Sequence, residues 1–284
     1  MRWQPYQHII FDFDSTLTTI EGVDVLAGDR AAQLSVEALT QQAMNGSLSL
    51  EEVYARRLQT IQPTRAAVRA LREIYKKHLA EDAAEVIAAL QHLGHSVYIV
   101  SGGLIEPIAE VAVALHVPRE HVFAVDLEYD QLAGQWWTRA GDAERFAHER
   151  YLRPRKSALQ TSGGKSEIIA KLLHGKRGQS LLVGDGITDL MASSTVDLFL
   201  AFAGTVTRST VVEAAPAALH TPSLAPVLIL AAGPAAVQRL AKQEHIALYR
   251  KARRLINQDA LVFRDNALAK KFADALSRAI PTQE

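Results

Sequence analysis

The sequence predicts an α/β protein with a parallel sheet, a helical segment inserted directly after the first strand, and a helical C-terminal extension. From residue 82 onward, short apolar runs alternate with segments of helical spacing, which is typical of βαβ units and a parallel sheet. Residues 21–80 instead carry apolar positions at helical spacing, with breaks at Asn45–Gly46 and Gln62–Pro63. After Gly233 the apolar residues again follow helical stripes.

Each element can be assigned in chain order. A buried strand is expected over residues 8–13, where a short apolar run is closed by acidic residues. Beyond the insertion we expect helices over 83–93, 105–115 and 165–173, and strands over 96–100, 121–125 and 180–183. Residues 125–137 indicate a hairpin that turns at Ala133–Gly134, and the polar, Arg-rich residues 139–160 indicate an exposed loop.

These elements divide the chain into an α/β core from residues 1–17 and 81–229, a helical cap from 18–80, and a helical extension from 230–284. Two apolar stripes run along the extension: Val237, Leu240, Leu248, Leu255 and then Leu268, Phe272, Leu276, Ile280. The stripes favour helices that pack on the body, or on a second subunit of a homodimer, over a basic binding arm.

Composition excludes several classes of function. Lys plus Arg equals Asp plus Glu at 31 each, so no global charge points to nucleic acid or to an anionic membrane. The absence of cysteine excludes disulfides, thiolate metal sites and cysteine nucleophiles. No signal peptide and no apolar run of membrane-spanning length is visible, so we expect a cytoplasmic enzyme.

Acidic residues close the first expected strand in the segment FDFDSTL, residues 11–17. Asp12 and Asp14 are two positions apart on a strand, so their side chains point the same way. Ligands of open α/β sheets bind at the carboxyl ends of strands. The pair therefore predicts a metal site with one acid left for proton transfer, although Asp-x-Asp alone is more often a turn.

Two further junctions carry groups that suit an anion. In IVSGGL, residues 99–104, Ser101 stands where a strand ends and a helix begins, and helix N-termini bind anions. In SGGKSEII, residues 162–169, Lys165 opens a helix and could link a phosphate to a carboxylate. A P-loop is rejected because its first glycine position holds Leu159 and no apolar strand precedes the loop.

The segment LLVGDGITDL, residues 181–190, delivers two more carboxylates to a strand end. Asp185 lies in a glycine-flanked turn, and Asp189 follows one helical turn later. Together with the first motif they offer the hard oxygen ligands that Mg²⁺ prefers. A pair of helix-capping aspartates is the simpler interpretation of this segment by itself.

Taken together and in this order, the four motifs resemble those of the haloacid dehalogenase superfamily, and most closely its phosphoserine phosphatase family. The resemblance extends over about the first four-fifths of the chain, through EGVDVLA (21–27), Ala43–Met44 with Gly46, RRLQTIQP (56–63) and FAGTVTRSTV (202–211). Asn45 departs from the glycine that family members often carry, and residues 139–160 are longer than the usual connection.

The resemblance implies a Rossmann-like core that hydrolyses phosphoserine to serine and phosphate through an aspartyl-phosphate. Asp12 would be the nucleophile, and Asp14 would protonate the leaving oxygen and then deprotonate the attacking water. Mg²⁺ would be held by Asp12, the backbone carbonyl of Asp14 and Asp185, with Asp189 supporting them. The phosphoryl group would contact Ser101, Gly102 and Lys165.

The same resemblance assigns the substrate side. Glu21 would bind the ammonium group of phosphoserine and Arg57 its carboxylate. The other substrate-binding residues would be Met44, Gly103, Thr188 and Arg208. The main alternative is the same chemistry on phosphothreonine, phosphocholine or a sugar phosphate. A haloalkanoate dehalogenase needs no acid at Asp14, and a phosphate-sensing or scaffolding protein does not need every catalytic position filled, so both are disfavoured.

Overall fold

In a computed structural model of the 284-residue chain, residues 3–28, 38–39, 50–132 and 141–279 are described. Their main sheet has seven strands in the order β3-β2-β1-β6-β7-β8-β9. The bounds are β1 Tyr6–Phe11, β2 Ser96–Leu104, β3 Val122–Val125, β6 Gln179–Gly184, β7 Leu198–Phe202, β8 Ala217–Leu219 and β9 Leu261–Phe263. All neighbouring strands are parallel except β8 and β9, so the predicted parallel α/β sheet is confirmed.

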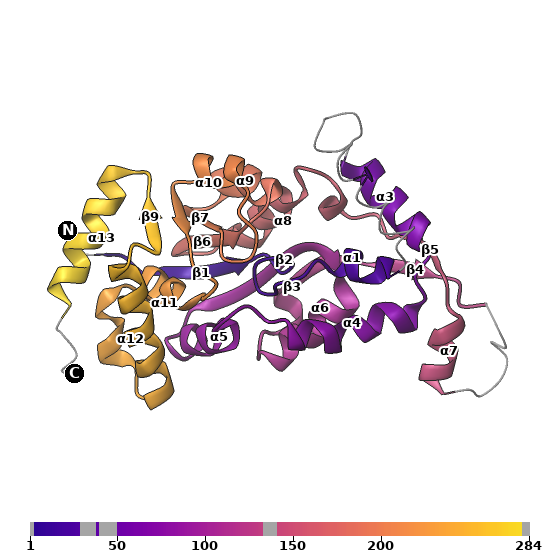
Figure 1. Ribbon diagram of the computed structural model, residues 1–284, viewed down its shortest axis with the longest axis horizontal. Coiled ribbons are helices and arrows are strands. Elements are labelled where there is room, and N and C mark those ends of the chain that lie inside the picture. Colours follow the sequence, from indigo (N-terminus) through magenta and orange to yellow (C-terminus); the bar gives the residue numbers. More distant parts are fainter. Residues whose placement is uncertain (1–2, 29–37, 40–49, 133–140, 280–284) are drawn as a thin grey trace.

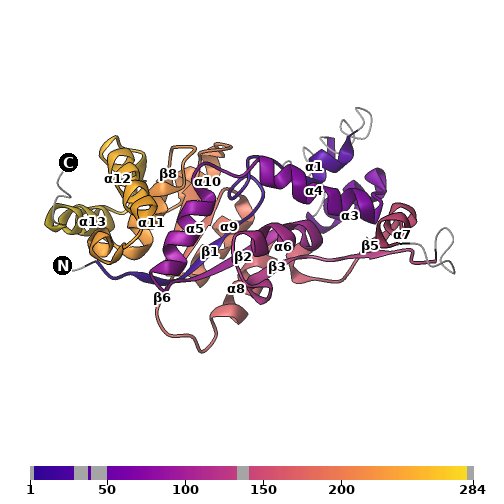
Figure 2. The same ribbon diagram turned by 90° about the horizontal axis from the view of Figure 1, so that it is seen from below.

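Helices cover both faces of this sheet (Figures 1 and 2). One face carries α5 Ala83–His92, α6 Ile105–Ala114 and α11 Ala225–Ala232, and the other carries α8 Gly164–Leu173, α9 Ile187–Ala192 and α10 Ser209–Ala214. Successive strand side chains point to opposite faces. Ile9 and Phe11 accordingly belong to one apolar core, whereas Ile10 belongs to the other.

The helical insertion between β1 and β2 contains α1 Gly22–Ala27, α3 Leu50–Ile61 and α4 Arg65–Lys77. It lies at the opposite end of the molecule from the C-terminal helices (Figure 1). Its entry and exit run side by side, because Thr19 N–H donates to His78 O at 2.8 Å and Ala80 N–H donates to Leu17 O at 2.9 Å. Both ends of the insertion are thereby anchored beside the end of β1.

The exposed loop predicted over residues 139–160 was wrong. β4 Leu127–Tyr129 does begin an antiparallel pair, but its partner is β5 Tyr151–Pro154, within the segment expected to be a loop. That segment also forms α7 Asp142–His148 and the 3₁₀ turn η2 Ala158–Gln160. The expected turn at Ala133–Gly134 lies outside the described residues. A four-residue strand of sequence YLRP carries too little periodicity to be recognised without its partner.

The C-terminal extension is helical as predicted, with the 3₁₀ segment η4 Pro234–Arg239, α12 Gln243–Asn257 and α13 Asn266–Arg278. Its apolar stripes pack against the body of the same chain, where Leu240, Leu248 and Phe272 are buried. Ile280 lies outside the described residues. The extension also supplies β9, an edge strand that the sequence analysis did not anticipate.

Among the described residues, no helix has both the length and the apolar character needed to cross a membrane. The division of the chain into core, cap and extension at the predicted boundaries stays a prediction.

Candidate active site

Three aspartates meet where β1 and β6 end. Asp12 follows β1 and continues its pairing, since Asp12 N–H donates to Val183 O at 2.9 Å. Asp185 follows β6, and Asp189 lies one turn into α9. One carboxylate oxygen from each of the three lies within 4.8 Å of the others, and all three residues are buried. We call Asp12, Asp185 and Asp189 the acid cluster.

Lys165 enters the acid cluster from the first turn of α8. Its Nζ lies 2.7 Å from Asp12 Oδ2 and 2.7 Å from Asp189 Oδ1, and its side chain is buried. Burial alone would lower the pKa of this ammonium, but the charges of Asp12 and Asp189 raise its pKa above the usual value. Lys165 is therefore a fixed cation beside the expected nucleophile.

The turn after β1 brings Asp14 to the same end of the sheet. Ser15 has a φ of 56°, which is uncommon for a residue with a side chain and turns the loop sharply. Asp14 Oδ1 accepts hydrogen bonds from Tyr75 OH at 2.8 Å and from Gly22 N–H at 3.1 Å. Burial above all, followed by the charge of Glu21, raises the pKa of the Asp14 carboxyl well above its usual value. A carboxyl whose pKa is raised in this way suits a general acid.

Glu21 and Arg208 lie at the edge of the acid cluster. Arg208 Nε donates to Asp185 Oδ2 at 3.0 Å, and its Nη2 lies 3.6 Å from Glu21 Oε1. The structure therefore brings both predicted substrate residues to the acids. Desolvation by burial raises the pKa of Glu21, although a hydrogen bond from Ser15 Oγ at 2.6 Å opposes this rise.

The predicted phosphate-binding serine is buried within β2, which extends to Leu104 rather than ending at Val100. Ser101 Oγ accepts a hydrogen bond from Gly103 N–H at 3.0 Å, and Gly102 between them is half-buried. Thr188 is half-buried in the first turn of α9, between the two aspartates of the fourth motif. Ser101 and Gly102 thus belong to the carboxyl-terminal part of β2, the neighbour of β1, and Thr188 belongs to the helix that follows Asp185.

Arg57 lies on α3, in the helical insertion, and forms an ion pair with Asp24 of α1. Within the described part of the chain, its Nε and the hydroxyl of Tyr54 are buried without a hydrogen-bond partner. The charges of both Asp14 and Arg57 act on Tyr54, so these two residues share its surroundings. No contact in the described residues joins Arg57 to the acid cluster, and Met44 lies outside those residues.

Three residues without an assigned role in the sequence analysis hold the site together. Ser15 donates to Glu21, and Thr16 Oγ1 donates to Asp185 Oδ1 at 2.9 Å. Their place in the segment FDFDSTL was a signal that could have found them. Tyr75 reaches Asp14 from 61 positions away, and nothing in its local sequence REIYKK marks it.

The acid cluster fits a divalent metal ion. Its oxygen donors are those that Mg²⁺ and Ca²⁺ prefer. Burial first, and then the charge of Asp12, raise the pKa values of Asp185 and Asp189. A cation at this position would relieve the repulsion that raises them.

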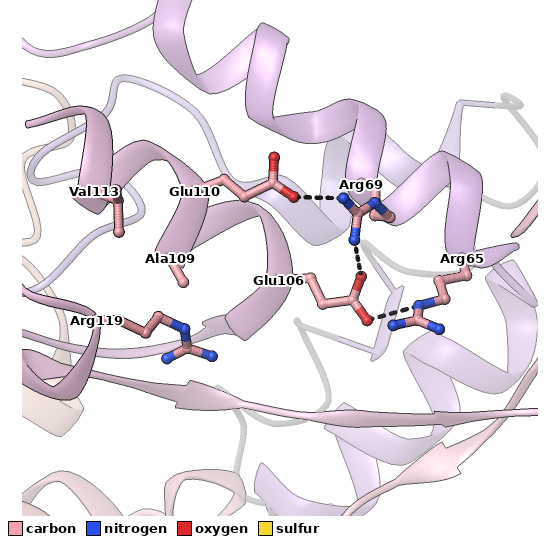
Figure 3. A pocket seen from close by; sticks show the side chains of 7 residues that line it. All are labelled: Arg65, Arg69, Glu106, Ala109, Glu110, Val113 and Arg119. Atoms are coloured by element: carbon pink, nitrogen blue, oxygen red, sulfur yellow. Dashed lines mark hydrogen bonds and ion pairs between the residues drawn. The ribbon is translucent and has the colours of Figure 1, made fainter. Parts of the chain in front are cut away.

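A separate surface pocket of about 470 Å³ lies between α4 and α6. Figure 3 shows that Arg65 and Arg69 of α4 converge there on Glu106 of α6. Glu110 of α6 also pairs with Arg69, at 2.9 Å. None of the predicted site residues lines this pocket. Its ion pairs join α4 of the insertion to α6, a helix that covers the sheet.

Comparisons with known proteins identify the family of the chain. A family model described as haloacid dehalogenase-like hydrolase matches residues 9–194. The chain is 32% identical to the phosphoserine phosphatase of Rattus norvegicus over 206 residues, which cover 72% of this chain and 84% of the relative. The phosphoserine phosphatase of Homo sapiens matches with the same identity and coverage.

Solved structures share the fold. A substrate-bound phosphoserine phosphatase complex has a TM-score of 0.63 at 23% identity, covering 80% of this chain and 98% of that one. A phosphoserine phosphohydrolase-like protein from Francisella tularensis subsp. tularensis SCHU S4 has a TM-score of 0.61 at 24% identity, with coverages of 74% and 93%. At these identities the two structures bear on the fold alone.

Proposed function

Because the chain belongs to the haloacid dehalogenase-like hydrolases, and among them to the phosphoserine phosphatase family, we propose that it hydrolyses O-phospho-L-serine to serine and phosphate. The observation that carries the proposal is the meeting of Lys165, Asp12 and Asp14 at the carboxyl end of the sheet. A nucleophile, a buried cation and a carboxyl with a raised pKa are the groups that phosphoryl transfer requires.

In the proposed reaction, a carboxylate oxygen of Asp12 attacks phosphorus while Asp14 protonates the departing serine oxygen. Asp14 then takes a proton from the water that hydrolyses the aspartyl-phosphate. Lys165, together with Ser101 and Gly102, would hold the phosphoryl oxygens and stabilise their charge. Because Lys165 Nζ lies 2.7 Å from Asp12 Oδ2, it would remain beside the phosphoryl group after that group has been transferred to Asp12.

Asp12 and Asp185, together with the backbone carbonyl of Asp14, would hold Mg²⁺, with Asp189 beside them. The ion would supply positive charge against the phosphoryl group and the clustered carboxylates. Arg208 pairs with Asp185 and Thr16 donates to it, so both fix the orientation of this carboxylate.

The choice of phosphoserine over other phosphomonoesters rests on Glu21 and Arg57. Glu21 lies beside Arg208 at the acid cluster and offers a carboxylate to the substrate ammonium. Arg57 offers a planar guanidinium whose Nε has no partner among the described residues, which suits a carboxylate. The relatives that the chain matches are named phosphoserine phosphatase, which supports the same substrate here.

A phosphate-release assay tests the proposal. The panel contains phosphoserine, phosphothreonine, phosphocholine, phosphoethanolamine and a sugar phosphate, each with Mg²⁺ and after exhaustive chelation. We expect the highest kcat/KM for phosphoserine with Mg²⁺ and loss of activity on chelation. Preference for another panel member would replace the substrate but keep the chemistry, whereas full activity after chelation would contradict the metal assignment. The cytoplasmic location and a homodimer stay predictions.

A further inference from the structure

We propose that Tyr75, on helix α4 of the insertion, is a positioning residue for Asp14. It determines which of the two carboxylate oxygens of Asp14 exchanges a proton with the substrate and with water. This inference rests on the proposed phosphatase activity, and it adds to the site a residue that no sequence motif marks.

Two donors occupy the same oxygen of Asp14. Tyr75 OH donates to Oδ1 at 2.8 Å, and the backbone N–H of Gly22 donates to Oδ1 at 3.1 Å. In this arrangement Oδ1 accepts from both groups, so a proton on Oδ2 leaves both hydrogen bonds intact, whereas a proton on Oδ1 would require Tyr75 OH to turn from donor to acceptor. The proton of the acid form is therefore carried on Oδ2.

The second oxygen of Asp14 lies beside Gly103, a predicted substrate-binding position. A Cβ added at Gly103 would lie 2.5 Å from Asp14 Oδ2, so this oxygen lies directly against the backbone of β2. Gly103 N–H donates to Ser101 Oγ at 3.0 Å, and Ser101 is a predicted phosphate ligand. With Oδ1 held by Tyr75, the side chain presents Oδ2 to the group that leaves and to the water that attacks.

Tight packing surrounds the Tyr75 side chain and its hydroxyl. The side chain is fully buried, and its ring meets Phe13 edge-on with centroids 4.9 Å apart. A Cβ added at Gly22 would lie 1.9 Å from Tyr75 OH, so the hydroxyl fills the space that the missing side chain leaves. Phe13 is itself the residue between Asp12 and Asp14, so Tyr75 supports the turn as well as the carboxyl.

The proton steps balance on this geometry. As the bond from Asp12 to phosphorus forms and the phosphorus–serine oxygen bond breaks, the Oδ2 proton of Asp14 moves to the serine oxygen. As water then bonds to phosphorus and the Asp12–phosphorus bond breaks, Oδ2 takes a proton from that water. Tyr75 keeps its own proton throughout and only holds Oδ1.

Tyr75→Phe removes the hydroxyl and keeps the ring. The matched control is Tyr249→Phe, since Tyr249 is also buried and its hydroxyl donates to Pro234 O at 2.5 Å, far from the site. We expect both variants to lose similar thermal stability. Only Tyr75→Phe should lower kcat, by about 10-fold, which is a part of the ~10²–10⁴-fold that general acid–base catalysis contributes. Its KM should stay within about 2-fold of the wild type, since Asp14 acts on the reaction and not on ground-state binding.

A second measurement separates acid catalysis from general damage to the site. Release of the leaving group in the first turnover is followed for the best phosphomonoester of the panel and for acetyl phosphate, whose acetate leaves without needing a proton. Tyr75→Phe should slow the first far more than the second. The proposal is overturned if kcat is unchanged, or if both leaving groups slow by the same factor. Using the best panel substrate keeps this test independent of the phosphoserine assignment.

Gly22→Ala gives the same test by another route. Its methyl group would displace the Tyr75 hydroxyl while leaving the tyrosine in the chain. We expect the same selective loss in the first turnover, and normal acid catalysis by a folded Gly22→Ala protein would contradict the role of Tyr75.

Discussion

Lys165 and Asp12 form an ion pair of 2.7 Å although both side chains are buried. Asp12 Oδ1 also accepts a hydrogen bond from Phe13 N–H at 2.7 Å, so its carboxylate is held from both sides. A buried charge that loses its partner is costly, but Lys165 keeps Asp189 at 2.7 Å if Asp12 is neutralised. The nucleophile can therefore be tested without unfolding the chain.

Asp12→Asn should abolish turnover and leave a folded protein, because an amide is nearly isosteric with a carboxylate but a poor nucleophile. Phosphate release measures the turnover, and circular dichroism shows whether the variant is folded. Asp126→Asn, at a half-buried aspartate outside the site, is the control and should keep wild-type activity. Near-normal hydrolysis by a verified Asp12→Asn preparation would sink the proposed mechanism.

The acid cluster should make metal binding depend on pH. Burial and the charge of Asp12 raise the pKa of Asp189 in the folded chain to about 8. A carboxyl whose pKa is raised by folding gives its full stability below its unfolded pKa of about 4, and this stability is lost as the pH rises through the folded value. Without metal, the melting temperature should therefore fall between about pH 5 and pH 8. Mg²⁺ binds the deprotonated acids, so its stabilising effect should grow over the same window.

Melting temperatures with and without Mg²⁺ at several pH values measure this dependence. We expect the rise in melting temperature caused by Mg²⁺ to be larger near pH 8 than near pH 5, and Asp189→Asn to flatten both trends. A Mg²⁺ effect that shrank as the pH rose would contradict a metal site built on these carboxylates. Ca²⁺ should bind as well but inhibit turnover, because it accepts more ligands at longer distances and can engage the second oxygen of Asp12.

Features that depend on residues close together in the chain could be predicted from the sequence. The strand expected over residues 8–13, which the structure shows as β1 Tyr6–Phe11, was predictable because it is a continuous apolar run. The helices from 83 and 105 were predictable because their apolar residues recur at helical spacing. The positions of Asp12, Ser101 and Asp185 were predictable because parallel strands bring their carboxyl ends to one edge of the sheet. Functional side chains at strand ends can thus be recognised from the sequence before the fold is known.

Contacts between distant segments were not visible. β5 and β9 are short strands that form because a partner strand is present, and their own residues do not alternate clearly. Tyr75 lies in a helix whose apolar spacing explains its burial, so no pattern distinguishes its hydroxyl from a core tyrosine. Its role appears only once α4 is placed beside the turn after β1.

The C-terminal extension should contribute stability and not chemistry. Phe272 of α13 meets Trp3 edge-on at 4.9 Å between ring centroids and lies 5.2 Å from Phe263 of β9, so it joins both ends of the chain. Phe272→Ala should cost about 3–5 kcal/mol of the free energy of unfolding, as buried aromatic truncations do. The kcat of the folded variant, measured well below its melting temperature, should equal that of the wild type.

Val262→Ala is the control for this prediction, since Val262 lies on β9 with 42% of its surface exposed. Chemical denaturation should show little change for it. Removal of the chain after Gly233 is a larger change than Phe272→Ala, because β8 then loses its partner strand β9. We expect the shortened protein to be less stable or to associate, and complete inactivity of a shortened protein that remained folded would show that the extension belongs to the site.

Selectivity for the substrate should depend on Arg57. Its guanidinium is paired with Asp24, and its Nε is buried without a partner among the described residues. A substrate carboxylate would satisfy that Nε, and a lysine at this position could not reproduce the planar, two-point contact. Phosphoserine carries this carboxylate, whereas phosphoethanolamine is the same molecule without it, so the pair isolates the contribution of Arg57.

Arg57→Ala should lower kcat/KM for phosphoserine by about 10²-fold or more, because the substrate carboxylate then enters the pocket without its partner. The same variant should turn over phosphoethanolamine nearly as well as the wild type does. Arg56→Ala is the matched control, since Arg56 precedes Arg57 on α3 but is exposed, and it should leave both substrates unaffected. The measurement is kcat/KM for the two substrates with the three proteins. If the wild type hydrolysed phosphoethanolamine as well as phosphoserine, Arg57 would have no carboxylate to recognise, and the phosphoserine assignment would fall while the roles of Asp12 and Asp14 stood.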